Sequence, residues 1–400
     1  MMTEKAFPAV GLDLGSSRTR CVVCLVEDQH LRLLASTECA SRGWMKSRIA
    51  DQNAVTECVL TVLAEAERQS GISIDSAVVG FGGTTVRGAN SRSRIELGRP
   101  REIEQRDINR ALDRVTHVHL REDRMLLQLF PQDFIVEDQP GHRDPRRMLA
   151  QRLEANAHVI TGSVREHTSL VAAVNQAHIE VEETVYEPVA AHFAAVLPED
   201  RHEGMALVDI GAQSTELVVF YDESLQLAWS LPICGDHFTR DVALTFHIGL
   251  DEALAAKEQY GSATAEYTSD NSVVEVESGA GDSLRELPRR FMNEIIEARA
   301  RELFEFVRRE LAKVGMERAL VGGVVLTGGG AGLSALCDIA ESVLKCQARK
   351  GLPLGIEGWP PEIDDPAWTV VAGLAMYSAK LKVQGELERQ SAGLLARILR

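Results

Sequence analysis

The sequence predicts a two-lobed α/β fold in which a ligand cleft lies between the lobes. The first observation is a repeated pattern of apolar strand, aspartate, glycine-containing turn and apolar strand, found in 11–26 (GLDLGSSRTRCVVCLV) and again in 207–222 (LVDIGAQSTELVVFYD). Two similar units indicate duplicated lobes that each offer a strand–turn–strand hairpin. The second observation is an apolar strand that runs into three glycines at 324–330, where the backbone can approach a ligand closely.

The composition is that of a large globular protein. Its 400 residues, 45% of them hydrophobic, are enough for roughly two to four folding units with buried cores. The net charge of −16 argues against nucleic acid as a partner, because binding a phosphate backbone needs a basic face. We expect no membrane-spanning helix and no signal peptide, because long apolar runs are missing from the chain and from its N-terminus.

The cysteines fit a reducing compartment. There are seven, and they follow no disulfide framework spacing, which is typical of a cytosolic protein. Cys21 and Cys24 lie in an apolar, strand-like run, so we predict that they are small core residues and not a redox or zinc half-site.

Hydrophobic periodicity divides the chain into strands and helices. In the first half it predicts strands at 10–13, 19–26, 31–37 and 76–80 and helices at 53–69, 170–178 and 189–197, the last stopped by Pro198. In the second half it predicts strands at 206–209, 215–221 and 324–326 and helices at 291–314 and 371–380. Small polar residues predict a surface hairpin or loop at 261–283, and prolines predict a loop at 351–366.

A stretch rich in arginine and other polar residues, 84–165, separates the early strands from the helices that follow. Within it, apolar spacing predicts a helix at about 105–115 and strands near 125–129 and 134–136. We interpret this stretch as a small subdomain inserted into the first lobe.

The turn after the first strand carries the first candidate binding group. In a tight turn such as 13–18 (DLGSSR), backbone N–H groups and short hydroxyls point outward and can bind phosphate oxygens. Asp13 at the strand end can order water around Mg²⁺, which prefers carboxylates and retains several waters. The candidate ligands are Asp13, Gly15, Ser16, Ser17 and Arg18. Taken alone, an ordinary hairpin turn is the alternative.

Two further turns extend this site. The turn of the second unit, 209–215 (DIGAQST), is predicted to oppose the first, and its candidate ligands are Asp209, Gly211, Ser214 and Thr215. Asp209 would be the second carboxylate for Mg²⁺. The third turn offers Gly328, Gly329 and Gly330, whose backbone can approach a planar ligand or a phosphate. A generic strand-to-helix turn is the alternative for these glycines.

Glu187 is the candidate catalytic residue. It precedes Pro188 at the predicted start of a helix, in 186–191 (YEPVAA), where its carboxylate can orient an attacking water. The alternative is a carboxylate that only stabilises the helix N-terminus through the macrodipole.

The order of these motifs resembles the superfamily of actin, heat-shock-chaperone and hexokinase ATPases. The chain carries four motifs in the superfamily's order: Asp-x-Gly-Ser, Glu-Pro-x-Ala-Ala, Asp-x-Gly and Thr-Gly-Gly-Gly. In the superfamily these positions correspond to the first phosphate hairpin, a connecting helix, the second phosphate hairpin and the adenosine turn. The resemblance implies an actin-like two-lobed ATPase fold with four subdomains around a nucleotide cleft. It also implies ATP in that cleft, with Mg²⁺ held mainly through water by Asp13 and Asp209.

Three segments are similar to the FtsA family of bacterial cell-division proteins. They are 127–158 (LQLFPQDFIVEDQPGHRDPRRMLAQRLEANAH), 234–261 (CGDHFTRDVALTFHIGLDEALAAKEQYG) and 291–303 (FMNEIIEARAREL). The resemblance covers about 8–380, and the first segment favours this family over MreB and over the chaperones.

The FtsA resemblance implies a subdomain division. Subdomain 1A would be 8–83, 166–203 and 367–382; 1C would be 84–165; 2A would be 204–235 and 321–366; and 2B would be 236–320, with a linker and terminal helix at 383–400. By the same resemblance, 1C meets neighbouring copies and later division proteins, and 2B meets the C-terminal tail of FtsZ. Lys257 and Glu258 match positions near the adenosine.

The second phosphate turn departs from the family pattern Asp-x-Gly-Gly-Gly-Thr. Ala212 and Gln213 replace two glycines, and a positive φ at either residue would cost about 1–3 kcal/mol. The Gln213 side chain would also lie where backbone should approach phosphate. We therefore expect ATP binding with weak or absent ATPase activity. A second departure is Cys234, where the family favours glycine.

The C-terminal residues 393–400 (GLLARILR) have an amphipathic pattern after a polar linker at 381–392. As a helix they would place Leu394, Leu395, Ile398 and Leu399 on one face and Arg397 and Arg400 opposite. This basic, apolar helix suits an anionic membrane surface but is too short to span a bilayer. A helix that docks on the protein body is the alternative, and the family resemblance favours the membrane.

These expectations combine into one hypothesis. The protein binds ATP, polymerises, docks FtsZ and anchors FtsZ filaments to anionic lipids on the cytoplasmic face of the inner membrane at the division septum. The alternative is a PilM-like actin-fold scaffold of type IV pilus assembly, against which the segment 127–158 argues. A small-molecule kinase of the same superfamily is a further alternative, but the sequence offers no convincing catalytic base for an acceptor.

Overall fold

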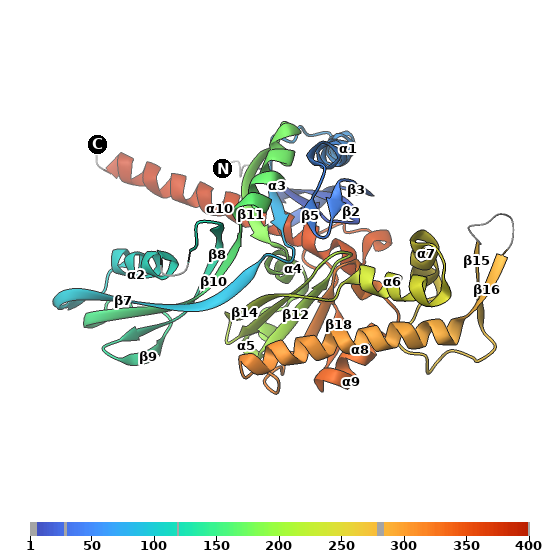
Figure 1. The fold of residues 1–400 in the computed structure, drawn as a ribbon. Helices are drawn as coiled ribbons and strands as arrows, with labels where there is room; N and C mark the ends of the chain where they lie inside the picture. Colours follow the sequence, from blue (N-terminus) through green and yellow to red (C-terminus); the bar gives the residue numbers. More distant parts are fainter. Residues whose placement is uncertain (1–5, 28–29, 118–119, 278–283, 399–400) are drawn as a thin grey trace.

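The computed structural model of this chain describes residues 6–27, 30–117, 120–277 and 284–398. They form two lobes of the same strand arrangement and a smaller inserted unit, which lies beside lobe II (Figure 1). We call the lobe that contains β1 lobe I and the lobe that contains β12 lobe II.

Lobe I contains a five-stranded sheet with the order β11-β6-β1-β2-β3. Its strands are β1 (Phe7–Leu14), β2 (Arg18–Glu27), β3 (His30–Ala40), β6 (Ser76–Phe81) and β11 (Glu180–Tyr186). β1, β2 and β3 are antiparallel neighbours, whereas β6 runs parallel to β1 and β11. Cys21 and Cys24 are fully buried in β2, which confirms that they are core residues.

Lobe II repeats this topology in the order β18-β17-β12-β13-β14. Its strands are β12 (Met205–Ile210), β13 (Thr215–Tyr221), β14 (Ser224–Leu231), β17 (Val324–Thr327) and β18 (Ala348–Lys350). The first three are antiparallel neighbours, and β17 runs parallel to β12 and β18. The repeated sequence pattern thus forms the hairpin β1–β2 in lobe I and the hairpin β12–β13 in lobe II.

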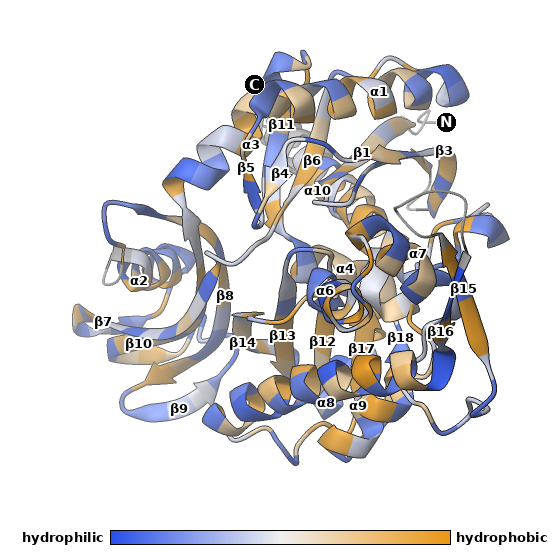
Figure 2. Cartoon of the chain, turned by 45° about the vertical axis from the view of Figure 1, so that its right-hand side comes forward, coloured by the Kyte–Doolittle hydropathy of each residue, from blue (hydrophilic) through white to orange (hydrophobic). Residues whose placement is uncertain are grey.

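Helices cover the sheets and bury their apolar faces. Lobe I carries α1 (Gln52–Ser70), α3 (Val164–Gln176), α4 (Glu187–Ala195) and the start of α10 (Thr369–Ile398), and α5 (Pro198–Glu203) leads to lobe II. Lobe II carries α6 (Gly235–Phe246), α7 (Leu250–Tyr260), α8 (Arg289–Lys313) and α9 (Leu336–Leu344). Figure 2 shows mostly hydrophobic strands in lobe II beside an α8 of mixed character, as expected for a helix that buries one face.

The inserted unit has a core of its own. It comprises β7 (Arg87–Glu102), α2 (Gln105–His117), β8 (Arg124–Val136), β9 (Gln139–His142) and β10 (Leu149–Ser163). Its strands extend the sheet of lobe II in the order β14-β7-β10-β8-β9, through the single pair Trp229 and Arg87. The smaller hairpins are β4 (Trp44–Met45) with β5 (Arg48–Ile49) and β15 (Val273–Glu277) with β16 (Leu284–Pro288).

The structure corrects the predicted strands of the inserted unit. The strands near 125–129 and 134–136 are one strand, β8, because Pro131 lies at a register shift and does not end the pairing with β10. The long strands β7 and β10 were not predicted. In β7, exposed residues alternate with buried Ser91, Ser93 and Ile95, and the two buried serines conceal the usual apolar alternation.

Two predicted boundaries were also wrong. Pro198 does not stop a helix: α4 already ends at Ala195, and Pro198 begins α5, because proline suits the first helical turn. The linker predicted at 381–392 is helical, since α10 continues to Ile398. Its Lys, Glu, Gln and Arg residues are strong helix formers.

The predicted membrane-facing residues are at the end of α10, which projects from lobe I (Figure 1). Leu394, Leu395, Arg397 and Ile398 belong to this helix, although their side chains lie outside the described part of the structure. Leu399 and Arg400 lie outside the described residues altogether. Within the described ranges, each helix is too short or too polar to cross a membrane.

Candidate functional site

The two equivalent hairpins meet at one cavity. Both have tight turns, and the ladder register places Asp13 opposite Arg20 in β1–β2 and Asp209 opposite Glu216 in β12–β13. Residues that are directly opposite in an antiparallel ladder share one face of the sheet. Each hairpin therefore presents an aspartate and one further charged side chain together.

The cavity has a volume of about 800 Å³ and is lined by both lobes. This volume is within the usual range of small-molecule sites. All predicted binding and catalytic residues except Thr215 line it: Asp13, Gly15, Ser16, Ser17, Arg18, Glu187, Asp209, Gly211, Ser214, Lys257, Glu258, Gly328, Gly329 and Gly330. Thr215 is fully buried in β13, away from the lining.

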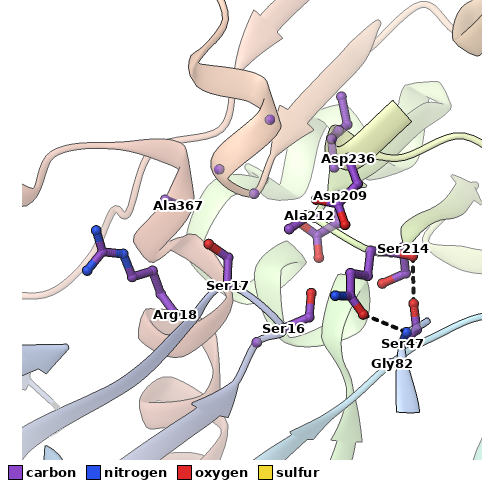
Figure 3. A pocket seen from close by; sticks show the side chains of 18 of the residues that line it. Ser16, Ser17, Arg18, Ser47, Gly82, Asp209, Ala212, Ser214, Asp236 and Ala367 are labelled. Carbon is purple, nitrogen blue, oxygen red and sulfur yellow. Dashed lines mark hydrogen bonds between the residues drawn. The ribbon is translucent and has the colours of Figure 1, made fainter. Parts of the chain in front are cut away.

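The first turn offers hydroxyl groups to the cavity. Figure 3 shows Ser16 pointing toward Asp209 of the second hairpin, whereas Arg18 points away from it. The second turn is connected to α6, because Gly235 N–H donates to the Gly211 carbonyl over 2.8 Å. Both turns therefore border one space, and its lining includes the serines Ser16, Ser17 and Ser214, as expected of a phosphate site.

Three carboxylates form a compact cluster beside this space. Oxygen atoms of Glu187, Asp209 and Glu216 all lie within 4.8 Å of one another. Glu187 occupies the first turn of α4, where the sequence placed it, and its carboxylate packs on the backbone of Gly82. A Cβ atom at Gly82 would lie 2.3 Å from Glu187 Oε2, so only glycine lets the carboxylate take this position.

Burial and mutual repulsion disfavour ionisation of these groups. Burial raises the pKa of Asp13 to about 6, although Arg20 opposes the shift. Burial raises the pKa of Asp209 well above its usual range, and the charge of Glu216 raises it further. The same two causes, with burial again the larger, raise the pKa of Glu187 well above its usual range. Burial also raises the pKa of Glu216 to about 7, while the Gly83 N–H, which donates to its Oε1 over 2.6 Å, lowers it.

This set of donors fits a hard divalent cation. It contains only carboxylate oxygens, and a cation bound near them would offset the repulsion that raises their pKa values. Asp13 and Asp209 come from opposite lobes and both line the cavity, so a cation between the lobes would face both aspartates. The residues present therefore fit the Mg²⁺ that the sequence led us to expect.

Lys257, Glu258 and the glycine turn also line the cavity. Lys257 Nζ donates to Thr239 Oγ1 over 2.9 Å, and burial lowers the pKa of the lysine. Gly328 has a φ of 78°, and a Cβ atom there would lie 2.4 Å from Asp209 Oδ1. Glycine at this turn thus leaves room for Asp209 as well as for a ligand.

The strain expected in the second phosphate turn is absent. Neither Ala212 nor Gln213 is among the described residues with a positive φ, so these side chains impose no left-handed backbone strain. The Gln213 side chain is also directed to the other lobe, where its Oε1 accepts a hydrogen bond from Ser47 N–H. Backbone strain in this turn therefore gives no reason to expect weak hydrolysis.

Sequence reasoning missed several charged residues of the site, among them Arg20 and Glu216. Both line the cavity, and each lies opposite the aspartate of its own hairpin. The signal was available, because both residues follow their aspartate at the same spacing, Asp13 to Arg20 and Asp209 to Glu216. In a hairpin of that length, the equal spacing places the pair face to face.

These lobes and this cleft define the class of protein, the actin-like ATPase fold. A solved structure of the PilM–PilN type IV pilus biogenesis complex matches with a TM-score of 0.66 at 16% identity, covering 92% of this chain and 98% of that chain. MreB5 of Spiroplasma citri bound to ADP matches with a TM-score of 0.58 at 12% identity, covering 95% and 98%. At these identities, the likeness concerns the fold alone.

The chain belongs to the FtsA family of cell division proteins. The family described as "Cell division protein FtsA" matches 206–373, and the one described as "SHS2 domain inserted in FTSA" matches 83–161. The cell division protein FtsA of Pseudomonas aeruginosa is 30% identical over 96% of this chain and 90% of that protein. The FtsA proteins of Borreliella burgdorferi (31%, covering 96% and 94%) and Escherichia coli K12 (27%, covering 95% and 92%) are also similar. These matches favour FtsA over the PilM-like alternative.

Proposed function

We propose that this protein binds ATP, polymerises and tethers FtsZ filaments to the inner membrane at the division septum. The observation that carries the proposal is the pair of facing turns over one cavity, with Asp13 and Asp209 on opposite lobes, in a chain of the FtsA family. The ATP phosphates would lie between the turns at 13–18 and 211–214. The adenosine would lie toward Lys257, Glu258 and the glycine turn.

The chain's own residues define what the site can do with a nucleotide. Turn amides and the hydroxyls of Ser16 and Ser17 would bind phosphate oxygens, and Arg20 would add a positive charge. Mg²⁺, when bound, would neutralise phosphate charge, held mainly through water by Asp13 and Asp209. Glu187 would orient a water near the terminal phosphate, and we expect turnover to be weak.

The proposed partners follow the proposed subdomains. Subdomain 1C (84–165), which includes the inserted unit with its own core, would meet neighbouring copies and other division proteins. Subdomain 2B (236–320) would bind the C-terminal tail of FtsZ. It exposes several large apolar side chains, as a peptide-binding surface requires: Leu244, Leu250, Tyr267, Val273 and Phe291.

Calorimetry with MgATP tests nucleotide binding directly. We expect saturable binding that is tighter with Mg²⁺ than without it, because the carboxylate cluster would otherwise repel the phosphates. Phosphate release on the same sample is expected to be slow relative to binding. A chain that binds neither ATP nor ADP in the presence of Mg²⁺ would refute the proposal. Rapid phosphoryl transfer to a sugar would support the kinase alternative instead.

Deletion of 391–400 is expected to abolish sedimentation with vesicles that contain anionic lipid. The deletion removes both arginines and all four apolar residues of the predicted membrane-binding segment 393–400, while the two lobes stay complete. One short amphipathic helix binds weakly, so the wild-type chain is expected to sediment best under conditions where it polymerises. The control is Leu149→Ala, which removes an exposed leucine of the inserted unit. Equal sedimentation of the deletion variant and the wild type would contradict the membrane role.

A further inference from the structure

A small hairpin of lobe I borders the cavity and is held in a strained turn. Its strands β4 and β5 are joined by Lys46 and Ser47, whose φ values are 52° and 57°. A residue other than glycine, asparagine or aspartate rarely takes this left-handed conformation. Such a turn persists only where its surroundings hold it in place.

Gln213 of lobe II supplies that support. The Ser47 backbone N–H donates to Gln213 Oε1 over 2.8 Å, and the Ser47 hydroxyl donates to the Gln213 carbonyl over 2.6 Å (Figure 3). Ser47 is buried, although it lies at the tip of a turn. Both bonds join the lobes, because the hairpin follows β3 of lobe I and Gln213 lies between β12 and β13 of lobe II.

The hairpin is also attached to its own lobe. Arg48 Nε lies 2.9 Å from Glu166 Oε1 on α3, and both residues line the cavity. Trp44 lines it as well, and its buried indole Nε1–H has no acceptor among the residues that the structure describes.

We propose that the hairpin 44–49 is a lid over the phosphate end of the cleft, and that Gln213 is the positioning residue that holds it closed. The inference rests on the proposed nucleotide binding and assigns a role to the side chain that replaces glycine in the second turn. Glycine at this position would leave only the bond between the Ser47 hydroxyl and the main chain. A nucleotide under the lid would leave only after the contact between the lobes opens. The two hydrogen bonds between Ser47 and Gln213 would therefore slow its release.

Gln213→Ala removes one of the two bonds and keeps the other. A hydrogen bond of this kind contributes about 0.5–1.5 kcal/mol, so we expect a fluorescent ATP analogue to dissociate roughly 2- to 12-fold faster in a chase with unlabelled ATP. Met45→Ala is the matched control, because Met45 lies on the same hairpin and is 62% exposed. The control is expected to release the analogue at the wild-type rate.

Hydrogen exchange in the nucleotide-free chain tests the contact between Ser47 and Gln213 separately from nucleotide binding. The Ser47 amide is expected to exchange slowly in the wild type and in Met45→Ala, and faster in Gln213→Ala. Unchanged exchange in Gln213→Ala would overturn the lid. Faster exchange with an unchanged release rate would overturn it too, because the hairpin would then open without controlling release. A wild type that binds no nucleotide would refute the proposed function, and exchange would still show whether Gln213 holds the hairpin.

Discussion

Asp13→Ala is expected to lower the affinity for MgATP by roughly 10- to 100-fold, the usual effect of removing an outer-shell partner of a metal ion. Asp13 is buried at the end of β1 and faces Arg20 across the hairpin. Burial raises its pKa to about 6, so near pH 7 the group is mostly ionised. A cation bound with ATP would stabilise this charge, and alanine would remove the interaction while leaving the turn amides in place.

Calorimetry with and without Mg²⁺ separates this role from a structural one. In EDTA the variant is expected to bind ATP as well as the wild type or better, because one negative charge near the phosphates is gone. The control is Asp113→Ala, an exposed aspartate of α2 that is remote from the cavity. An equal loss of affinity in Mg²⁺ and in EDTA would contradict the assignment and indicate that Asp13 only supports the fold of the turn.

The architecture was predictable because its signals are local. Apolar strands, an aspartate and a glycine turn are adjacent in the sequence, and their repetition predicted both the duplicated lobes and the two facing hairpins. Glu187 was predictable for the same reason, since Pro188 marks the start of α4. Motifs of this kind need no knowledge of which segments meet in space.

The contact of Ser47 with Gln213 was not predictable, because it depends on the approach of two lobes that are distant in the sequence. Glu216 is different, since its spacing from Asp209 within one hairpin was a usable signal. Local rules also failed where side chains were atypical for their element. Ser91 and Ser93 face the inserted unit's core in β7, where their hydroxyls donate to carbonyls of α2, so hydrogen bonding replaces the apolar signal.

Gly373→Ala is expected to destabilise lobe I by about 3 kcal/mol, at the upper end of the usual cost of overpacking. Gly373 lies where α10 crosses α4, and a Cβ atom there would lie 1.8 Å from the Ala190 carbonyl oxygen. The obstacle is backbone and not the end of a flexible side chain, so the helices must separate. Because α4 begins with Glu187, the same displacement is expected to weaken nucleotide binding.

The matched control is the same substitution in the same helix. A Cβ atom at Gly385 would meet no atom within 4 Å, so Gly385→Ala is expected to stabilise the helix by up to about 1 kcal/mol through helix propensity alone. Urea unfolding followed by tryptophan fluorescence should therefore shift in opposite directions for the two variants. Equal midpoints would show that α10 and α4 are not in close contact in solution. The position of Glu187 would then have to be maintained by its packing on Gly82 rather than by the support of α10.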